Sequence, residues 1–339
     1  MNVAFIAPGS LRTPTGGYVY DRHIVEALRS KHTVEVIEVP PDTSGVVATP
    51  HAARRLSRGG FDAVVQDGLC GKHLLALNCL IGRSAELVGV VHLLAKDDPR
   101  RGTVSEATEA SYLRTLDSCV YTSVATRRSS GSDADSVVAH PSSRFSPDVT
   151  EDEVWERSRR DGLRVAFVGD VSPVKRLGRL VRAVSSVPGC RVIVARRSPD
   201  RRYARRVKRL CSSLGVEDRV EFVGVLDTPS MASLLRDSDV VAVPSEHESF
   251  GTAYIEGMSF GLPAVGPVSG GAREVIEHRR NGFLVGDEKD LLEALSTLAG
   301  SPEVLGRMGV EALRTERGWV SWDETGKKVL EHIEGRVER

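Results

Sequence analysis

Short apolar runs recur along the chain, and polar or glycine-containing turns separate them. Such runs are typical of strands in parallel sheets, which helices cover on both faces. They occupy residues 3–6, 34–39, 61–65, 87–91, 117–122 and 136–139 in the N-terminal half, and residues 163–169, 191–195, 220–223, 240–243 and 263–267 in the C-terminal half. Stretches with helical periodicity lie between most of these runs. The alternation predicts an α/β fold in each half of the chain.

The repeating pattern lapses between residues 142 and 160, where many residues are charged. We interpret this segment as an inter-domain linker with a short helix. The predicted domains are residues 1–150 and 161–318, followed by a final helix within residues 319–339. A chain of 339 residues is long enough for two domains of ordinary size.

The composition is that of a soluble globular protein, with 40% hydrophobic and 27% charged residues. The chain has no formal net charge at pH 7, so it has no general attraction to nucleic acid. No apolar segment approaches the roughly 18 residues of a membrane span. The N-terminal apolar run is too short and uncharged for a signal peptide. The five cysteines are scattered without a C-x-x-C pair, which disfavours a disulfide framework or a zinc site and favours a cytoplasmic location.

One polar turn joins the strand at residues 240–243 to a helix at residues 253–260. Small residues, Ser249, Gly251 and Thr252, stand where this helix begins. The start of a helix presents free backbone N–H groups and the positive end of the helix dipole, which favour phosphate.

Two carboxylates, Glu248 and Glu256, flank this predicted phosphate site. With Glu248 in the turn and Glu256 in the helix, both can face one ligand. Carboxylates beside a phosphate are unfavourable unless they bind hydroxyl groups of the same ligand. A sugar and a ribose would supply such hydroxyls.

Two further features lie where ligands of parallel sheets gather. Gly16 and Gly17 follow the first strand and precede a helix at residues 18–29, which suggests close backbone approach to an anion. The G-x-G-x-x-G fingerprint is absent, so a nicotinamide dehydrogenase is disfavoured. His92 stands at the carboxyl end of the strand at residues 87–91, a usual place for ligand contacts.

The ordered series of motifs around Glu248 and Glu256 resembles the donor-binding motif of retaining glycosyltransferases of family 4. The resemblance continues at residues 270–276 and 281–285 and covers nearly the whole chain. It implies the GT-B fold, in which two Rossmann-like doubly wound domains face a cleft and the C-terminal helix crosses back to the N-terminal domain.

The same resemblance implies transfer of a sugar from a nucleotide-diphosphate sugar to an acceptor with retention at the anomeric carbon. The N-terminal domain would take the acceptor, which is a sugar, a lipid-linked molecule or a small molecule, and the C-terminal domain would hold the donor. Transfer of this kind is described as front-face attack and needs neither a metal ion nor another cofactor. The sequence offers no obvious enzyme nucleophile.

The resemblance also assigns roles to single residues. The implied catalytic residues are Glu248 at the donor sugar, His92 at a sugar hydroxyl or the acceptor, and Lys175 at the diphosphate. The implied donor-binding residues are Gly16, Gly17, Lys175, Ser249, Phe250, Gly251, Thr252 and Glu256, the last at the ribose.

Asp170 departs from the family pattern, because it occupies a position where an arginine usually contacts the diphosphate. An acid at this place is unfavourable unless it is paired or turned away, and Arg176 and Arg273 are candidate substitutes. The departure leaves open a non-catalytic GT-B partner subunit. A sugar-nucleotide epimerase on the same fold is another alternative, whereas the cofactor-lysine motif of a phosphorylase is not evident.

Residues 196–209 are densely basic. A solvated helix face is one interpretation of this segment. The alternative is a patch for anionic lipid or for a phosphate-bearing acceptor, which would place the protein peripherally on the inner membrane face. The acidic triplets at residues 133–135 and 237–239 each lead into a strand at the amino end of a sheet, away from the ligand side, so neither is predicted to bind a metal.

Overall fold

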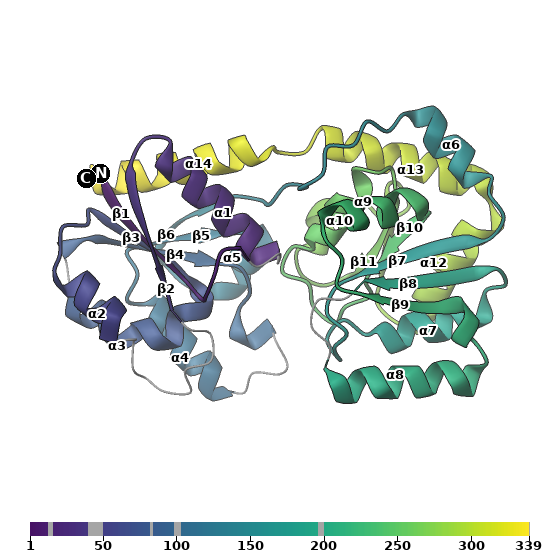
Figure 1. Ribbon diagram of the computed structural model, residues 1–339, viewed down its shortest axis with the longest axis horizontal. Helices are drawn as coiled ribbons and strands as arrows, with labels where there is room; N and C mark the ends of the chain where they lie inside the picture. Colours follow the sequence, from purple (N-terminus) through teal and green to yellow (C-terminus); the bar gives the residue numbers. More distant parts are fainter. Residues whose placement is uncertain (13–15, 40–49, 82–83, 98–102, 196–199, 339) are drawn as a thin grey trace. The chain divides into compact units, whose positions relative to one another are not determined.

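The computed structural model describes the chain except for residues 13–15, 40–49, 82–83, 98–102, 196–199 and 339. It divides into two compact units (Figure 1). Unit 1 comprises Met1–Pro141 together with Val320–Arg339, and unit 2 comprises Ser142–Trp319. The segment interpreted as a linker, residues 142–160, lies in unit 2 and contains helix α6 (Glu151–Ser158).

Unit 1 is built on a six-stranded sheet whose described strands all pair in parallel. Its strands are β1 (Asn2–Ala7), β2 (Thr33–Glu38), β3 (Ala63–Asp67), β4 (Glu86–Val91), β5 (Ser118–Tyr121) and β6 (Asp135–Val138). They lie in the order β2-β1-β3-β4-β5-β6. Parallel neighbours require crossover helices, and the helical stretches between the strands supply them.

Helices cover both faces of this sheet. They are α1 (Gly16–Arg29), α2 (Pro50–Ser57), α3 (Gly71–Ile81), α4 (Thr103–Leu113), α5 (Val124–Ser130) and α14 (Trp322–Val337), with 3-10 turns η1 (Gly68–Cys70) and η3 (Ala95–Asp97). Alternation along β1 explains the two layers. Val3 and Phe5 join a cluster with residues of α1 and α14, whereas Ala4 and Ile6 join one with residues of α2, α3 and α4.

Unit 2 repeats this plan with a second six-stranded parallel sheet. Its strands are β7 (Leu163–Val168), β8 (Cys190–Ala195), β9 (Val220–Gly224), β10 (Val240–Ala242), β11 (Ala264–Pro267) and β12 (Gly282–Val285). Their order is β12-β11-β10-β7-β8-β9. The central strands are valine-rich and buried, as expected for strands with no solvent-facing side.

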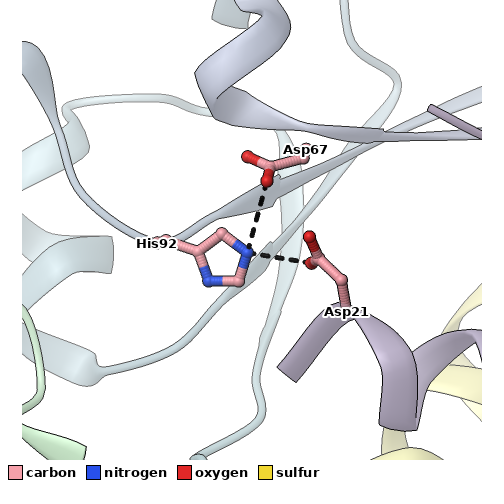
Figure 2. A group of neighbouring side chains, drawn as sticks. All are labelled: Asp21, Asp67 and His92. Atoms are coloured by element: carbon pink, nitrogen blue, oxygen red, sulfur yellow. Dashed lines mark hydrogen bonds and ion pairs between the residues drawn. The ribbon is translucent and has the colours of Figure 1, made fainter. Parts of the chain in front are cut away.

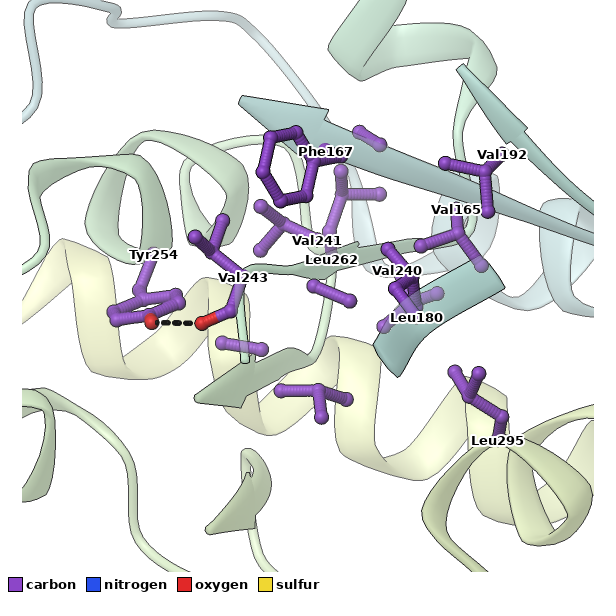
Figure 3. Close-up of a cluster of buried hydrophobic side chains, with 14 of the residues drawn as sticks. Val165, Phe167, Leu180, Val192, Val240, Val241, Val243, Tyr254, Leu262 and Leu295 are labelled. Carbon is purple, nitrogen blue, oxygen red and sulfur yellow. Dashed lines mark hydrogen bonds between the residues drawn. The ribbon is translucent and has the colours of Figure 1, made fainter. Parts of the chain in front are cut away.

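The remaining elements of unit 2 surround one hydrophobic core. They are α7 (Leu177–Ser186), α8 (Arg201–Leu214), α9 (Thr228–Asp237), α10 (Thr252–Met258), α11 (Ala272–Val275), α12 (Glu288–Gly300) and α13 (Pro302–Arg317), with the 3-10 turn η4 (Glu217–Arg219). Figure 3 shows Leu180, Tyr254 and Leu295 in the cluster around β7 and β10. The buried Tyr254 hydroxyl donates a hydrogen bond to the Val243 carbonyl at 2.7 Å, which ties α10 to the end of β10.

The predicted fold class is confirmed: each half of the chain is a parallel α/β layer structure. The apolar runs did not predict β12 or α2. β12 has only four residues and follows directly on a turn, and α2 is an arginine-containing helix beside residues outside the described part of the chain. Among the described residues, no helix combines the length and apolar composition needed to cross a membrane.

Candidate functional site

His92 lies against two aspartates in unit 1 (Figure 2). Its Nε2 is 2.9 Å from Oδ1 of Asp21 and 3.9 Å from Oδ2 of Asp67. His92 directly follows β4, the neighbouring β3 ends at Asp67, and Asp21 lies in α1. Both aspartates are buried, and Asp67 also accepts a hydrogen bond from the Leu69 N–H at 2.8 Å, which begins η1.

Burial and neighbouring charges set the protonation of this cluster. Burial lowers the pKa of His92, but the charges of Asp21 and Asp67 and the hydrogen bond to Asp21 outweigh it and raise the pKa to about 9. Burial and the Asp21 charge raise the pKa of Asp67 to about 8. These interactions therefore favour a protonated His92 at neutral pH.

The second ring nitrogen of His92 is turned away from both carboxylates in Figure 2. The Tyr20 ring packs edge-on against the imidazole, with centroids 5.2 Å apart, and so fixes its plane. About 12% of the His92 side chain is exposed. The ring is thus held from one side and can present an N–H donor on the other.

Lys175 and Glu248 form an ion pair in unit 2, with Nζ and Oε2 2.6 Å apart. Lys175 lies in the turn between β7 and α7, and Glu248 in the turn between β10 and α10. The same carboxylate oxygen accepts a hydrogen bond from the Ser245 hydroxyl at 3.1 Å. The structure therefore brings together two residues that the sequence predicted for one site.

Two glycines hold the Glu248 turn against the turn after β11. The Gly271 N–H donates to the Glu248 carbonyl at 2.7 Å, and the Ser269 hydroxyl donates to the Glu246 carbonyl at 2.8 Å. A Cβ on Gly270 would lie 2.1 Å from the Glu248 carbonyl oxygen, and Gly270 has a φ of 74°. A Cβ on Gly271 would lie equally close, 2.1 Å, to the Ser249 carbonyl oxygen. Only glycine permits this backbone approach.

Glu256 is buried in α10 and paired with Arg144. Arg144 Nε is 2.9 Å from Oε1, and Nη2 donates to Oε2 at 3.1 Å. Burial raises the pKa of Glu256, and the charge and hydrogen bond of Arg144 oppose this shift. This ion pair with one hydrogen bond opposes the effect of burial and fixes the position of the carboxylate.

Other predicted site residues are less closely involved with these groups. Gly16 and Gly17 are the first residues of α1, and residues 13–15 before them lie outside the described part of the chain. Phe250 is buried and packs against Trp319, with ring centroids 5.9 Å apart, so it serves the core. The half-buried Ser249 and Thr252 flank Gly251, which caps α10 with a φ of 92°.

Asp170 lies two residues after the end of β7 and is half-buried. Arg176, one candidate substitute for the missing arginine, instead pairs with Glu246, with Nη2 and Oε1 2.8 Å apart. It adopts a left-handed φ of 50°, which is uncommon for a residue with a side chain.

Within the described ranges, one group of three side chains has the composition of a metal site: Asp21, Asp67 and His92, whose ligand atoms lie within 4.8 Å of one another. Its His92 nitrogen is already hydrogen-bonded to Asp21. In the second acidic triplet, Asp239 Oδ2 accepts from the Arg164 N–H at 2.7 Å. This contact joins β7 to the residue before β10 and gives Asp239 a structural role.

Sequence reasoning missed Asp21, Asp67 and Arg144. A signal for Asp67 was present, because it ends the strand next to the one that precedes His92 and so shares the same sheet edge. Asp21 lies within a helix and Arg144 in an irregular segment. No local pattern marks these two residues.

Residues 149–314, all within unit 2, match the profile of the family described as glycosyl transferases group 1. D-inositol 3-phosphate glycosyltransferase of Actinosynnema mirum is 34% identical over an alignment of 187 residues that covers 50% of this chain and 43% of that protein. The enzyme of the same name from Mycobacterium bovis is 33% identical over 178 residues, covering 49% and 36%. The chain thus spans less than half the length of these curated relatives.

Solved structures resemble the chain over almost its full length. Sucrose-phosphate synthase of Thermosynechococcus elongatus superposes with a TM-score of 0.83 at 18% identity, covering 99% of both chains. HepE of Anabaena, in complex with UDP and glucose, gives a TM-score of 0.82 at 18% identity, covering 99% of this chain and 100% of the other. The chain therefore has the GT-B fold, and its residues 149–314 match the glycosyl transferases group 1 family.

Proposed function

We propose that this protein transfers a sugar from a nucleotide-diphosphate sugar to a hydroxyl-bearing acceptor, with retention at the anomeric carbon. The observation that carries the proposal is the Lys175–Glu248 pair, which lies on adjoining strand ends inside the segment that matches the glycosyltransferase family. Lys175 offers a cation for the phosphate, and Glu248, which it contacts directly, offers a carboxylate for sugar hydroxyls. These are the two groups that a nucleotide-sugar requires.

Lys175 acts on the leaving diphosphate. Its ammonium group is a fixed positive charge, and a cation of this kind is worth most where negative charge develops in the transition state. Without donor it is neutralised by Glu248. On donor binding, the diphosphate competes for the ammonium group, and Glu248 is released to accept hydrogen bonds from the sugar.

Glu256 binds the ribose hydroxyls. Its pairing with Arg144 cancels most of its charge, so that a diphosphate nearby is not repelled. The lone pairs that Arg144 leaves open accept the hydroxyl protons. Arg144 is thus a positioning residue for the nucleotide.

His92 binds a hydroxyl of the sugar or of the acceptor. With a pKa of about 9 it is protonated at neutral pH and acts as a hydrogen-bond donor rather than as a base. The acceptor proton therefore passes to the departing phosphate oxygen. The acceptor oxygen forms a bond to the anomeric carbon as the bond from that carbon to the phosphate oxygen breaks, on the same face.

UDP-sugars are the first donors to test, because HepE was solved with UDP and UDP-glucose. Polyol phosphates are the first acceptors to test, because the curated relatives are named for D-inositol 3-phosphate. Sugars and lipid-linked molecules are the other acceptor classes. The proposed reaction needs no metal ion, since Lys175 supplies the positive charge at the diphosphate.

Asp170 favours a second candidate, a non-catalytic GT-B partner that has lost donor binding. An acid at the end of β7 adds negative charge on the side of the sheet where Lys175 lies. This candidate predicts that the protein binds no nucleoside diphosphate. An epimerase on the same fold would instead consume the donor without any acceptor.

The decisive experiment combines binding with turnover. Calorimetry should detect nucleoside diphosphate binding by the wild-type protein and a loss of at least about tenfold in affinity for Lys175→Ala. Product analysis should then show acceptor-dependent transfer, unchanged in excess chelator. Absence of nucleotide binding would support the non-catalytic partner, and chelator-sensitive activity restored by manganese would contradict the metal-free mechanism.

A further inference from the structure

Four arginines line a cavity of about 350 Å³ between α7 and α8 in unit 2. Arg176, Arg179 and Arg182 come from α7 and its first turn, and Arg206 comes from α8. Gly178, Tyr203, Val207 and Leu210 complete the lining. None of the lining residues that the structure describes is acidic, so this part of the wall carries only positive charge.

Nearby acids balance only part of this charge. Arg176 pairs with Glu246, and Arg182 Nε lies 3.7 Å from an oxygen of Glu288. Arg179 reaches only a backbone carbonyl, that of Gly286, at 3.5 Å. Arg206 has no ion pair with any residue that the structure describes. Two guanidinium groups therefore line the cavity without a carboxylate partner among the residues that the structure describes.

Backbone and hydroxyl groups add to the positive field. The Gly178 N–H, in the first turn of α7, donates a hydrogen bond to the Tyr203 hydroxyl at 3.1 Å. This bond holds the hydroxyl oxygen in place at the cavity wall. Among the described residues no side chain caps the start of α7, where the positive end of the helix dipole lies. Arginines so gathered repel one another unless an anion lies between them.

We propose that this cavity binds the phosphate group of an organophosphate. Arginine forks match phosphate geometry, and a cavity of this volume is at the lower end for small-molecule sites. Val207 and Leu210 give one apolar wall, which suits the carbon part of the molecule. The phosphate is that of a soluble metabolite or of a lipid headgroup.

This site is separate from the proposed donor site, because neither Lys175 nor Glu248 lines the cavity. The proposal does not rest on the proposed function. Of the basic residues predicted at 196–209, Arg206 lines the cavity, and residues 196–199 lie outside the described part of the chain.

Binding of glycerol 3-phosphate, measured by calorimetry, tests the proposal. The pocket variant is Arg179→Glu with Arg206→Glu, and the control variant is Arg205→Glu with Arg209→Glu. The control arginines are exposed on α8, do not line the cavity and give the same change in net charge. We expect the pocket variant to lose at least about tenfold in affinity and the control variant to stay within about threefold of the wild type. Lys175→Ala should keep the wild-type affinity, which separates this site from the donor site.

A sedimentation assay distinguishes the two phosphate sources. If the wild-type protein binds phosphatidylglycerol vesicles but not phosphatidylcholine vesicles, and glycerol 3-phosphate displaces it from them, the cavity binds a lipid headgroup. Binding of glycerol 3-phosphate alone identifies a soluble ligand. Saturable binding of neither probe would overturn the proposal, and so would equal losses in the pocket and control variants. Thermal melting of both variants checks that they remain folded.

Discussion

His92 owes its charge to two residues that are distant from it in sequence. Asp21 lies 71 positions before it, and the hydrogen bond between them is 2.9 Å long. Without a partner, burial would favour the neutral ring. His92 is thus protonated because of the tertiary structure of unit 1, and the role proposed for His92 depends on Asp21.

Asp21→Asn should lower the pKa of His92 from about 9, because the amide keeps the shape but removes the charge that holds the proton. NMR titration of the imidazole protons measures this directly. Activity of the variant should decline at a lower pH than that of the wild type. An unchanged His92 pKa in Asp21→Asn would show that Asp67 alone sustains the charge.

The cluster should also make stability depend on pH. The folded pKa of His92 lies above its ordinary value of 6.5, so its contribution is full below pH 6.5 and is lost as pH rises through about 9. The raised pKa of Asp67 also makes the free energy of unfolding fall as pH rises, at lower pH values than for His92, since folding favours the protonated form of Asp67 up to about pH 8. The free energy of unfolding, from urea titrations at several pH values, should fall over this alkaline range. His92→Gln should make the fall shallower, and an equally steep fall would refute the assignment.

Substitutions of Glu248 and Glu256 should affect different quantities, turnover and nucleotide affinity. Glu256→Gln should raise the Kd for nucleoside diphosphate by roughly tenfold, because it weakens charge-assisted bonds to the ribose and to Arg144. Glu248→Gln should lower kcat more than nucleotide affinity, because it frees Lys175 for phosphate while weakening the sugar contact. Calorimetry and initial rates on the same preparations give both numbers. Reversal of the two patterns would exchange the roles.

At the scale of elements, the site rests on two turns that share a backbone contact. The turn before α10 carries Glu248, and the turn before α11 carries Gly270 and Gly271. Carbonyl oxygens of the first turn occupy the space where Cβ atoms on the second would lie. Neither turn can move without the other, so Glu248 is held in place from outside its own turn.

Gly270→Ala should impair the site by displacing Glu248, because its Cβ would meet the Glu248 carbonyl oxygen and its φ is left-handed. We expect lower stability and a loss of turnover of about fivefold or more, roughly the effect of a 1–3 kcal/mol strain. Gly335→Ala in α14 is the control, since nothing lies within 4 Å of its added Cβ. That change should stabilise the protein by about 0.5–1 kcal/mol. Wild-type turnover in Gly270→Ala would show that the turns can separate at no cost.

Sequence patterns predicted the elements better than the contacts between them. Buried strands and the turns that follow them are local features, which is why His92 and Glu248 could be singled out from the sequence, whereas Lys175 was identified through the family resemblance. The partners Asp21 and Arg144 could not, because their positions follow from how a helix and an irregular segment pack on distant strands. β12 escaped because four residues are too few to establish a periodicity.

At the scale of the whole molecule, unit 1 is assembled from both ends of the described chain. Trp322 of α14 stacks on His23 at 4.2 Å, and the Thr325 hydroxyl donates to the His140 carbonyl at 2.6 Å. Val329, Leu330 and Ile333 are buried in the cluster that contains β1 and α1. The last helix is therefore part of the core of unit 1.

Removal of residues 320–339 should unfold or strongly destabilise unit 1. Three buried aliphatic side chains represent several kcal/mol at about 1.5–3 kcal/mol each, which is comparable to the stability of a whole domain. Hydrogen exchange should show β1 and α1 losing protection while β7 and β10 keep theirs. Lys327→Ala, an exposed change on α14, serves as control. Retained protection of β1 in the truncated protein would show that α14 is dispensable.

The discontinuity of unit 1 has a consequence for biosynthesis. Unit 2 is a continuous stretch and can fold as soon as it has been translated, whereas the first 141 residues emerge earlier but lack the helix that covers one face of their sheet. At typical translation rates they wait about 10–40 s for residues 320–339. During that interval an apolar surface on β1 and α1 stays open to chaperones and to other nascent chains. The yield of active protein in the cell should therefore depend on the speed of elongation through unit 2.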